Sequence, residues 1–340
     1  MADRPPLLSV LDLAPVPEGS SPSQALARSV DLIQMVEDLG FTRYWVAEHH
    51  NMAGIASSSP AVLIAHLAAL TERIRIGSGG VMLPNHAPLV VAEQFGLLAT
   101  LHPGRIDLGL GRAPGSDQAT TRALRRSHDR SGVDDFPQQL AELMGFLYGS
   151  FPGDHPYRHI TAVPRAAQPP ALWLLGSSGY SAQLAGMLGL PFSFAHHFAP
   201  AYTEPAVQLY RDSFRPSSAL DAPYVSVGAA VLAAESDEEA RWLHGPARLQ
   251  MLRLRSGRPQ PLSSPQDAEA YPWTPGERNA AGSFTSSHIV GAPDTVHAGL
   301  SELAQVTGAD ELIVATSTFS QEDRLRSYRL VAGAMSPAAA

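Results

Sequence analysis

Residues 73–111 read RIRIGSGGVMLPNHAPLVVAEQFGLLATLHPGRIDLGLG. Arg73–Met82 and Arg105–Gly111 are mainly apolar runs of strand length, and Leu89–Leu101 between them has the composition and length of a helix. Strands that are apolar throughout, each followed by a helix, indicate a parallel sheet that is buried on both faces. This stretch therefore predicts a strand–helix–strand unit of an α/β protein.

The same alternation continues in both directions along the chain. The predicted strands are Leu7–Leu13, Tyr44–Ala47, Arg73–Met82, Arg105–Gly111, Ala171–Leu175, Phe192–Ala195, Tyr224–Ala233 and Glu311–Thr316. Eight strand–helix units in a chain of 340 residues fit an α/β fold of the (β/α)8 TIM barrel type with loop insertions. An open doubly wound sheet is the alternative. We predict one barrel domain over residues 1–340, with insertions at about 150–170 and 256–287.

The composition excludes several classes of function. All 24 cationic side chains are arginine, and the chain contains no cysteine. Without lysine there is no Schiff base for pyridoxal phosphate and no phosphate-loop lysine of the nucleotide hydrolases. Without cysteine there is no disulfide, thiol nucleophile or cysteine-bound metal. A formal net charge of −8 argues against a nucleic-acid partner.

Two stretches of the sequence indicate where in the cell the protein resides. Residues 1–13 lack the basic and then apolar order of a signal peptide. The longest stretch without Asp, Glu, Lys or Arg is Ala166–Thr203, but prolines and glycines interrupt it, as they would not in a helix that spans a membrane. We therefore expect a soluble, cytoplasmic protein with no membrane partner.

Polar and glycine-rich groups follow the predicted strands at the end where barrel enzymes place their sites. These groups are Glu48-His49-His50, Gly79-Gly80, Arg112, Gly176-Ser177-Ser178-Gly179 and His196-His197-Phe198. The glycines, hydroxyls and N–H groups of residues 176–179 open a predicted helix and would suit a phosphate group. Arg112 would supply the positive charge. The alternatives are an ordinary helix cap for residues 176–179 and a surface ion pair for Arg112.

The adjacent histidines His49 and His50 admit three interpretations: a metal site, a proton-handling group or ordinary loop residues. Neighbouring residues in an extended segment point in opposite directions, so the two rings rarely bind one ion. The chain also has no HExxH motif. We predict that the protein has no metal site.

Several motifs together resemble a known family. They are Ala47-Glu48-His49-His50, residues 76–84 (IGSGGVMLP), Glu93-Gln94, residues 103–112 (PGRIDLGLGR), residues 174–178 (LLGSS) and residues 291–296 (GAPDTV). With them the chain resembles the bacterial luciferase-like monooxygenases, which are flavin-dependent (β/α)8 proteins. The resemblance covers nearly the whole chain and is closest to the stand-alone members, some of which tailor polyketides. A cysteine beside the flavin, found in light-emitting relatives, is absent here, where Leu110-Gly111 stand.

The resemblance implies a role for each residue at this end of the barrel. Arg112, Ser177, Ser178 and Tyr180 would hold the phosphate of FMN, and Gly79 and Gly80 would lie against its isoalloxazine ring. His49 would be the catalytic residue that handles protons beside the flavin. Met82, His197 and Phe198 are predicted to line the substrate pocket, with a place in the barrel core as the alternative for Met82 and Phe198.

The implied function is that of a two-component monooxygenase. A separate flavin reductase would supply reduced FMN, and molecular oxygen would add to it to give a C4a-(hydro)peroxyflavin. This species would oxygenate a small organic substrate of secondary metabolism. Hydride transfer with a deazaflavin and flavin binding without turnover are the alternatives.

Relatives also imply an assembly and a moving part. We expect a homodimer through the helices that follow the second and third strands, where Ala61–Leu70 is apolar. The 256–287 insertion is expected to close over the site as a lid, with Tyr271 and Trp273 covering the pocket.

Overall fold

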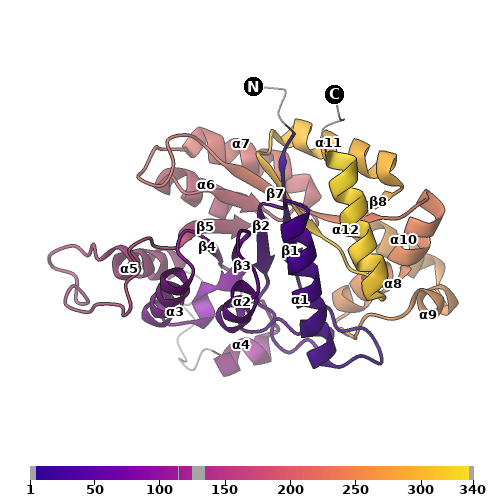
Figure 1. Ribbon diagram of the computed structural model, residues 1–340, viewed down its shortest axis with the longest axis horizontal. Coiled ribbons are helices and arrows are strands. Elements are labelled where there is room, and N and C mark those ends of the chain that lie inside the picture. The colour runs from indigo at the N-terminus through magenta and orange to yellow at the C-terminus, as the bar shows by residue number, and fades with distance from the viewer. Residues whose placement is uncertain (1–4, 114, 125–134, 337–340) are drawn as a thin grey trace.

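The computed structural model describes residues 5–113, 115–124 and 135–336. Eight parallel strands form its central barrel (Figure 1). They are β1 (Leu7–Asp12), β2 (Arg43–Val46), β3 (Arg75–Met82), β4 (Ile106–Gly111), β5 (Ala171–Gly176), β6 (Phe192–Phe194), β7 (Val225–Ala233) and β9 (Glu311–Ala315). Pairings of β6 with β7, β7 with β9 and β9 with β1 close the ring. The predicted (β/α)8 barrel is confirmed, and the open sheet is wrong.

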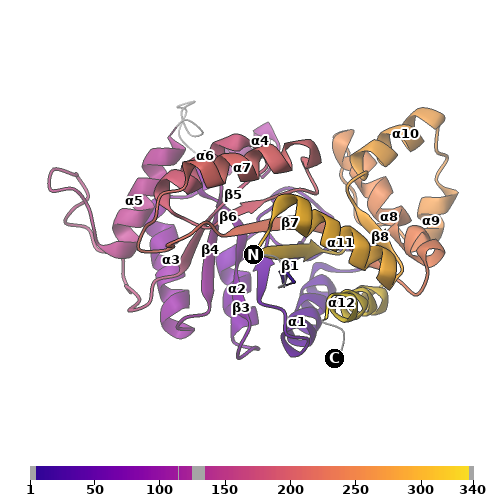
Figure 2. The ribbon, with the colours of Figure 1, turned by 90° about the horizontal axis from the view of Figure 1, so that it is seen from above.

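Helices follow the strands and surround the barrel (Figures 1 and 2). They are α1 (Pro22–Asp38), α2 (Pro60–Ala68), α3 (Pro88–Leu101), α4 (Gln118–Leu124), α5 (Phe136–Tyr148), α6 (Gly179–Leu188), α7 (Thr203–Ser213), α8 (Asp237–Arg255), α9 (Pro265–Ala270), α10 (Pro275–Phe284), α11 (Pro293–Thr307) and α12 (Gln321–Met335). Short 3-10 turns occupy Leu83–Asn85 and Pro200–Tyr202. The main core lies between the outer face of the barrel and these helices. Within the described ranges, no helix has the length and apolarity needed to cross a bilayer.

The two predicted insertions differ in structure. Residues 150–170 contain neither helix nor strand. Residues 256–287, predicted to be irregular, instead contain α9 and α10. The start signals of these helices are present in the sequence, since Ser264 and Thr274 cap their first turns and a proline follows each cap.

A short strand, β8 (Ile289–Gly291), lies outside the ring and was not predicted. It pairs with Val231–Ala233, the last part of β7, which extends beyond the barrel. In Figures 1 and 2 this strand lies with α8, α9 and α10 at one end of the molecule, while α3 and α5 lie at the other end. The connection between β7 and β9 therefore forms a layer of its own beside the barrel.

Charged side chains close the barrel interior near the N-terminal ends of the strands. The Arg43 guanidinium donates to Asp107 at 2.7 Å and to Glu311 at 2.6 Å, and all three residues are buried. Its central carbon lies 4.6 Å from the centroid of the Trp173 ring. Tyr224 donates a further hydrogen bond to Glu311 at 2.8 Å. This network fixes the positions of β2, β4, β5, β7 and β9 relative to one another.

Aromatic and aliphatic side chains fill the barrel above this network. Trp45, Trp173 and Ile313 form a buried cluster with Leu11 and Leu175 packed against it. Two glycines of β3 make room for the neighbouring strand β4. A Cβ on Gly77 would overlap the carbonyl oxygen of Asp107, and one on Gly80 would lie 2.7 Å from that of Gly109. Close approach between strands therefore requires glycine at both positions.

Candidate functional site

The residues predicted to bind a phosphate lie where β4 and β5 end. Arg112 follows β4 directly, and its central guanidinium carbon lies 4.1 Å from the centroid of the Tyr180 ring in the first turn of α6. Ser178 stands at the N-cap of α6, but its side chain makes no capping hydrogen bond, and both Ser177 and Ser178 are exposed. The structure thus brings the four predicted phosphate residues together at one helix N-terminus.

The charge around Arg112 bears on which ligand this group could hold. Among the ion pairs of the described residues none involves Arg112, so no carboxylate of this part of the chain neutralises its charge. The N-terminus of a ten-residue helix carries partial positive charge, which adds to that of the guanidinium. Hydroxyls, helix N–H groups and one cation are the groups that bind a phosphate monoester.

Gly79 and Gly80 lie on β3, between β2 with its histidines and β4 with Arg112. The peptide bond that joins them is cis. The register of β3 against β4 also shifts between Gly79 and Val81, so the strand is irregular at this point. The two glycines therefore present backbone rather than side chain at the rim between the two groups.

A buried carboxylate fixes the segment that follows β2. Glu48 is fully buried, and it accepts hydrogen bonds from the Met82 backbone N–H at 3.0 Å, from His50 at 2.9 Å and from His86 at 3.0 Å. Burial favours the protonated acid, but the hydrogen bonds from His86, His50 and Met82 and the charge of His86 outweigh it, so the pKa of Glu48 is lowered. The ionised Glu48 holds the backbone that carries His49 against the end of β3.

His49 lines a cavity, and its Nδ1 atom is buried without a hydrogen-bond partner among the described residues. Burial is the main reason that the pKa of His49 lies below its ordinary value. A hydrogen bond with the backbone of Gly115 and the charge of Glu48 offset only part of this effect. Near neutral pH the ring is therefore uncharged, and one nitrogen can accept a proton from a group bound in the cavity.

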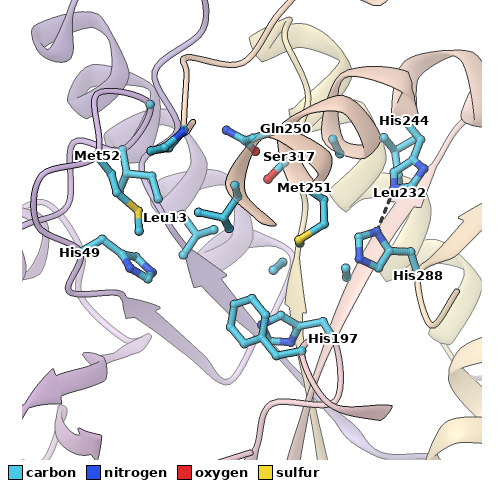
Figure 3. Close-up of a pocket in the computed structure, with 18 of the residues that line it drawn as sticks. Leu13, His49, Met52, His197, Leu232, His244, Gln250, Met251, His288 and Ser317 are labelled. Carbon is cyan, nitrogen blue, oxygen red and sulfur yellow. Dashed lines mark hydrogen bonds between the residues drawn. The ribbon is translucent and has the colours of Figure 1, made fainter. Parts of the chain in front are cut away.

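The cavity beside His49 has a volume of about 140 Å³ (Figure 3). Its walls come from the segments after β1 and β2, from the ends of β7 and β9, and from α8, β8 and residues 259–260. Figure 3 shows His49 on one side and the pair His244 and His288 on the opposite side, with Met251 between them. Most of the lining is apolar, with a few convergent polar groups, as is typical of a site for an organic ligand.

The residues predicted for the substrate pocket fall into two places. His197 and Phe198 line the cavity, whereas Met82 does not. The Met82 sulfur instead covers Gly111, where a Cβ would lie only 2.7 Å from it. Met82 therefore packs near the Arg112 end of the rim.

Tyr271 and Trp273 do not cover the cavity, so that expectation is wrong. They belong to a small cluster with Leu249 and Leu252 on α8, into which α9 and α10 also pack. The Trp273 indole donates to the Ala268 carbonyl at 2.9 Å, which holds the ring against α9. The physical reason is that the apolar faces of α9 and α10 are buried against α8, which orders the segment.

Two functional candidates, His244 and His288, were not found from the sequence. His244 Nε2 and His288 Nδ1 are 2.8 Å apart, although the residues lie on α8 and just before β8. Burial and the neighbouring histidine lower the pKa of His244 to about 3. Burial and the proximity of His197 lower that of His288 to about 4. The pairing of β8 with β7 and the packing of β8 on α8 bring the two together, and no sequence spacing signals either contact.

A TIM barrel whose strand ends carry an arginine, a helix N-terminus and a histidine beside an apolar cavity is typical of an enzyme that binds an organic ligand at this end. The chain belongs to the luciferase-like monooxygenase family, whose family model matches residues 8–311. It is 47% identical over 331 residues to a luciferase-like monooxygenase of Escherichia coli (strain K12), with 97% of each chain covered.

Two further relatives agree with this assignment. The chain is 36% identical to the N-acetyl-S-alkylcysteine monooxygenase of Bacillus subtilis (strain 168), with 96% of this chain and 98% of the relative covered. The crystal structure of apo-MsnO8 matches with a TM-score of 0.90 at 40% identity, over 98% of this chain and 100% of the other. The protein is a flavin-dependent monooxygenase.

Proposed function

We propose that the protein binds reduced FMN and uses molecular oxygen to oxygenate a small organic molecule. The observation that carries the proposal is the cation of Arg112, stacked on Tyr180 at the exposed N-terminus of α6 and free of any acidic partner in the described residues. These groups fit the phosphate of FMN in charge and in hydrogen-bonding capacity. A separate flavin reductase supplies the reduced cofactor in this proposal.

Each part of the rim has a distinct task in this proposal. Arg112, Ser177 and Ser178 hold the phosphate, and the backbone at Gly79-Gly80 leaves room for the planar ring. Reduced FMN supplies the electrons that activate oxygen. His49 lies in the segment after β2, the strand beside β3. Its Nδ1 has no hydrogen-bond partner in the described part of the chain and accepts a proton in this proposal. The apolar walls of the adjoining cavity keep water away from the reacting groups.

The experiment that tests this proposal compares two cofactors on the same protein. The purified protein is titrated without oxygen, in parallel, with reduced FMN and with a reduced deazaflavin, and oxygen is then admitted. We expect binding of reduced FMN and an oxygen-dependent change in the flavin absorbance. Binding of the deazaflavin alone, without oxygen consumption, would instead assign the protein to hydride transfer. Binding of FMN without any turnover would assign it to passive flavin binding.

Replacing Arg112 by glutamine tests the phosphate site directly. Loss of one charge-assisted contact is expected to raise the Kd for reduced FMN between about tenfold and about a hundredfold. The Kd for reduced riboflavin, which has no phosphate, should stay unchanged. Arg278→Gln removes an exposed arginine on α10 and serves as the control. Equal weakening of FMN and riboflavin by Arg112→Gln would show that Arg112 does not bind the phosphate.

We also infer a homodimer, which forms through α2 and α3. Val62 on α2 is 69% exposed and Leu97 on α3 is 49% exposed, and the two helices pack side by side. Light scattering should give twice the chain mass of 36.1 kDa, and Val62→Asp should shift the protein to the single-chain mass. Val163→Asp, at a 67% exposed valine of the 150–170 segment, should leave the mass unchanged. A single-chain mass for the unmodified protein would contradict the dimer.

A further inference from the structure

The cavity beside His49 is lined by uncharged residue types and histidines in the described part of the chain. Within the described part of the chain, its lining contains no Asp, Glu, Lys or Arg, and its polar side chains are four histidines, two glutamines and one serine. All four histidines have lowered pKa values because they are buried. A charged ligand would lose its water here without meeting an opposite charge, which disfavours its binding. The cavity therefore selects for uncharged molecules.

The orientation of one cavity histidine is fixed by the backbone. His197 Nδ1 lies 2.9 Å from the carbonyl oxygen of Gly228, and its ring packs on that glycine, where a Cβ would be 3.1 Å from Cε1. A carbonyl oxygen only accepts hydrogen bonds, so Nδ1 carries the hydrogen. In the uncharged ring Nε2 then bears a lone pair. In the described residues the ring has no other hydrogen-bond partner, so Nε2 remains an acceptor at the cavity wall.

The pair His244 and His288 supplies an adaptable group near this fixed acceptor. One hydrogen lies between His244 Nε2 and His288 Nδ1, which are 2.8 Å apart. When His244 donates that hydrogen, the uncharged His288 carries its own hydrogen on Nε2 and is a donor. Figure 3 shows the His288 ring between His244 and the side of the cavity where His197 lies. An acceptor and a donor thus stand on the same side of the cavity.

We propose that the cavity recognises an uncharged, mainly apolar organic molecule through one hydroxyl group. The hydroxyl donates to Nε2 of His197 and accepts from Nε2 of His288, because a hydroxyl is the neutral group that does both at one atom. His197 and His288 are then specificity-determining residues for the substrate. This assignment names the substrate class within the proposed function and rests on it.

The test measures binding of matched probes to the protein without flavin, by calorimetry near neutral pH. The probes are 2-naphthol, 2-methoxynaphthalene, which cannot donate a hydrogen bond, and 2-naphthoate, which is charged. We expect 2-naphthol to bind about tenfold more tightly than its methyl ether, because the ether leaves the His197 acceptor unpaired. We expect 2-naphthoate to bind more weakly than both.

Variants at two adjacent histidines separate recognition from folding. His197→Phe keeps the apolar volume but removes the acceptor, so the two neutral probes should bind equally well. His197→Gln offers an amide oxygen at a similar reach and should restore the preference for 2-naphthol. His196→Phe is the matched control, because His196 pairs with Thr203 at 2.8 Å and does not line the cavity. Its preference should equal that of the unmodified protein.

Each other outcome overturns a stated part of the proposal. Equal binding of 2-naphthol and its ether to the unmodified protein would refute hydroxyl recognition. Tight binding of 2-naphthoate would refute the selection against charge, and failure of all three probes to bind would refute a cavity for apolar ligands. Reduced FMN binding is measured on the same protein in parallel. If the probes bind but reduced FMN does not, the proposed cofactor is refuted and the assignment of the cavity stands.

Discussion

Replacing His49 by alanine is expected to slow the reoxidation of bound reduced FMN by oxygen about a hundredfold, which is the usual contribution of a general base. The Kd for reduced FMN should stay within about threefold, because His49 lies on the cavity side of the rim, away from the phosphate residues. Rapid mixing with oxygen, with protein in excess over flavin, measures both quantities. His159→Ala, at an exposed position in the 150–170 segment, is the control.

The pH dependence gives this prediction a second readout. Burial lowers the pKa of His49 below its ordinary value, so the ring is uncharged above that pKa and protonated below it. The reoxidation rate of the unmodified protein should therefore fall toward that of His49→Ala as the pH drops through a value below about 6.5. Above that value the rate should be independent of pH. The His49→Ala variant should lack this acid limb. Loss of FMN binding alone, with an unchanged rate for the flavin that remains bound, would refute the proton-accepting role.

Replacing Arg43 by methionine is expected to lower the free energy of unfolding by about 3–5 kcal/mol, as is typical when one partner of a buried ion pair is removed. Asp107 and Glu311 would lose their contacts with the guanidinium while both remain buried. These two carboxylates keep Arg43 charged despite its burial, and its pKa is raised. Urea unfolding measures the change.

An exposed ion pair provides the comparison for Arg43. Arg73 lies 3.4 Å from Asp38, and both side chains are largely exposed. Arg73→Met should therefore cost less than about 1 kcal/mol. Equal losses for the two variants would mean that the buried network adds no more stability than a surface pair. A change in the slope of the unfolding transition would instead indicate an altered unfolded or native state.

The barrel could be predicted because its signal is local and repeated. A strand such as Ile106–Gly111 is buried along its whole length, since one face meets the interior of the barrel and the other meets the helices. The helix predicted over Leu89–Leu101 is α3, which begins one residue earlier, at the proline that opens its first turn. The rim residues follow from the strand ends, where a parallel barrel places its site.

The other side of the cavity could not be predicted, because it depends on contacts between distant segments. His244 and His288 are 44 residues apart and meet only when β8 adds to the end of β7. Glu48 likewise gains its role from His86, which a turn after β3 brings within 3.0 Å. Neither contact leaves a periodic pattern in the sequence. Residues 256–287 do contain the cap signals of α9 and α10, but the many Pro, Ser and Gly residues favoured an irregular segment in the prediction.

Because β8 lies outside the ring, the residues that close the barrel differ from the residues that form this wall of the cavity. The barrel is closed by Ser226–Ala230 of β7, which pair with Glu311–Ala315, whereas β8 pairs with Val231–Ala233 beyond that closure. Substitutions in α8 and β8 therefore change the cavity wall without touching the strand pairs that close the barrel or Arg112, the arginine proposed to bind the cofactor phosphate. Related proteins with this fold can therefore acquire different ligands through substitutions in α8 and β8, while the rest of the barrel stays unchanged.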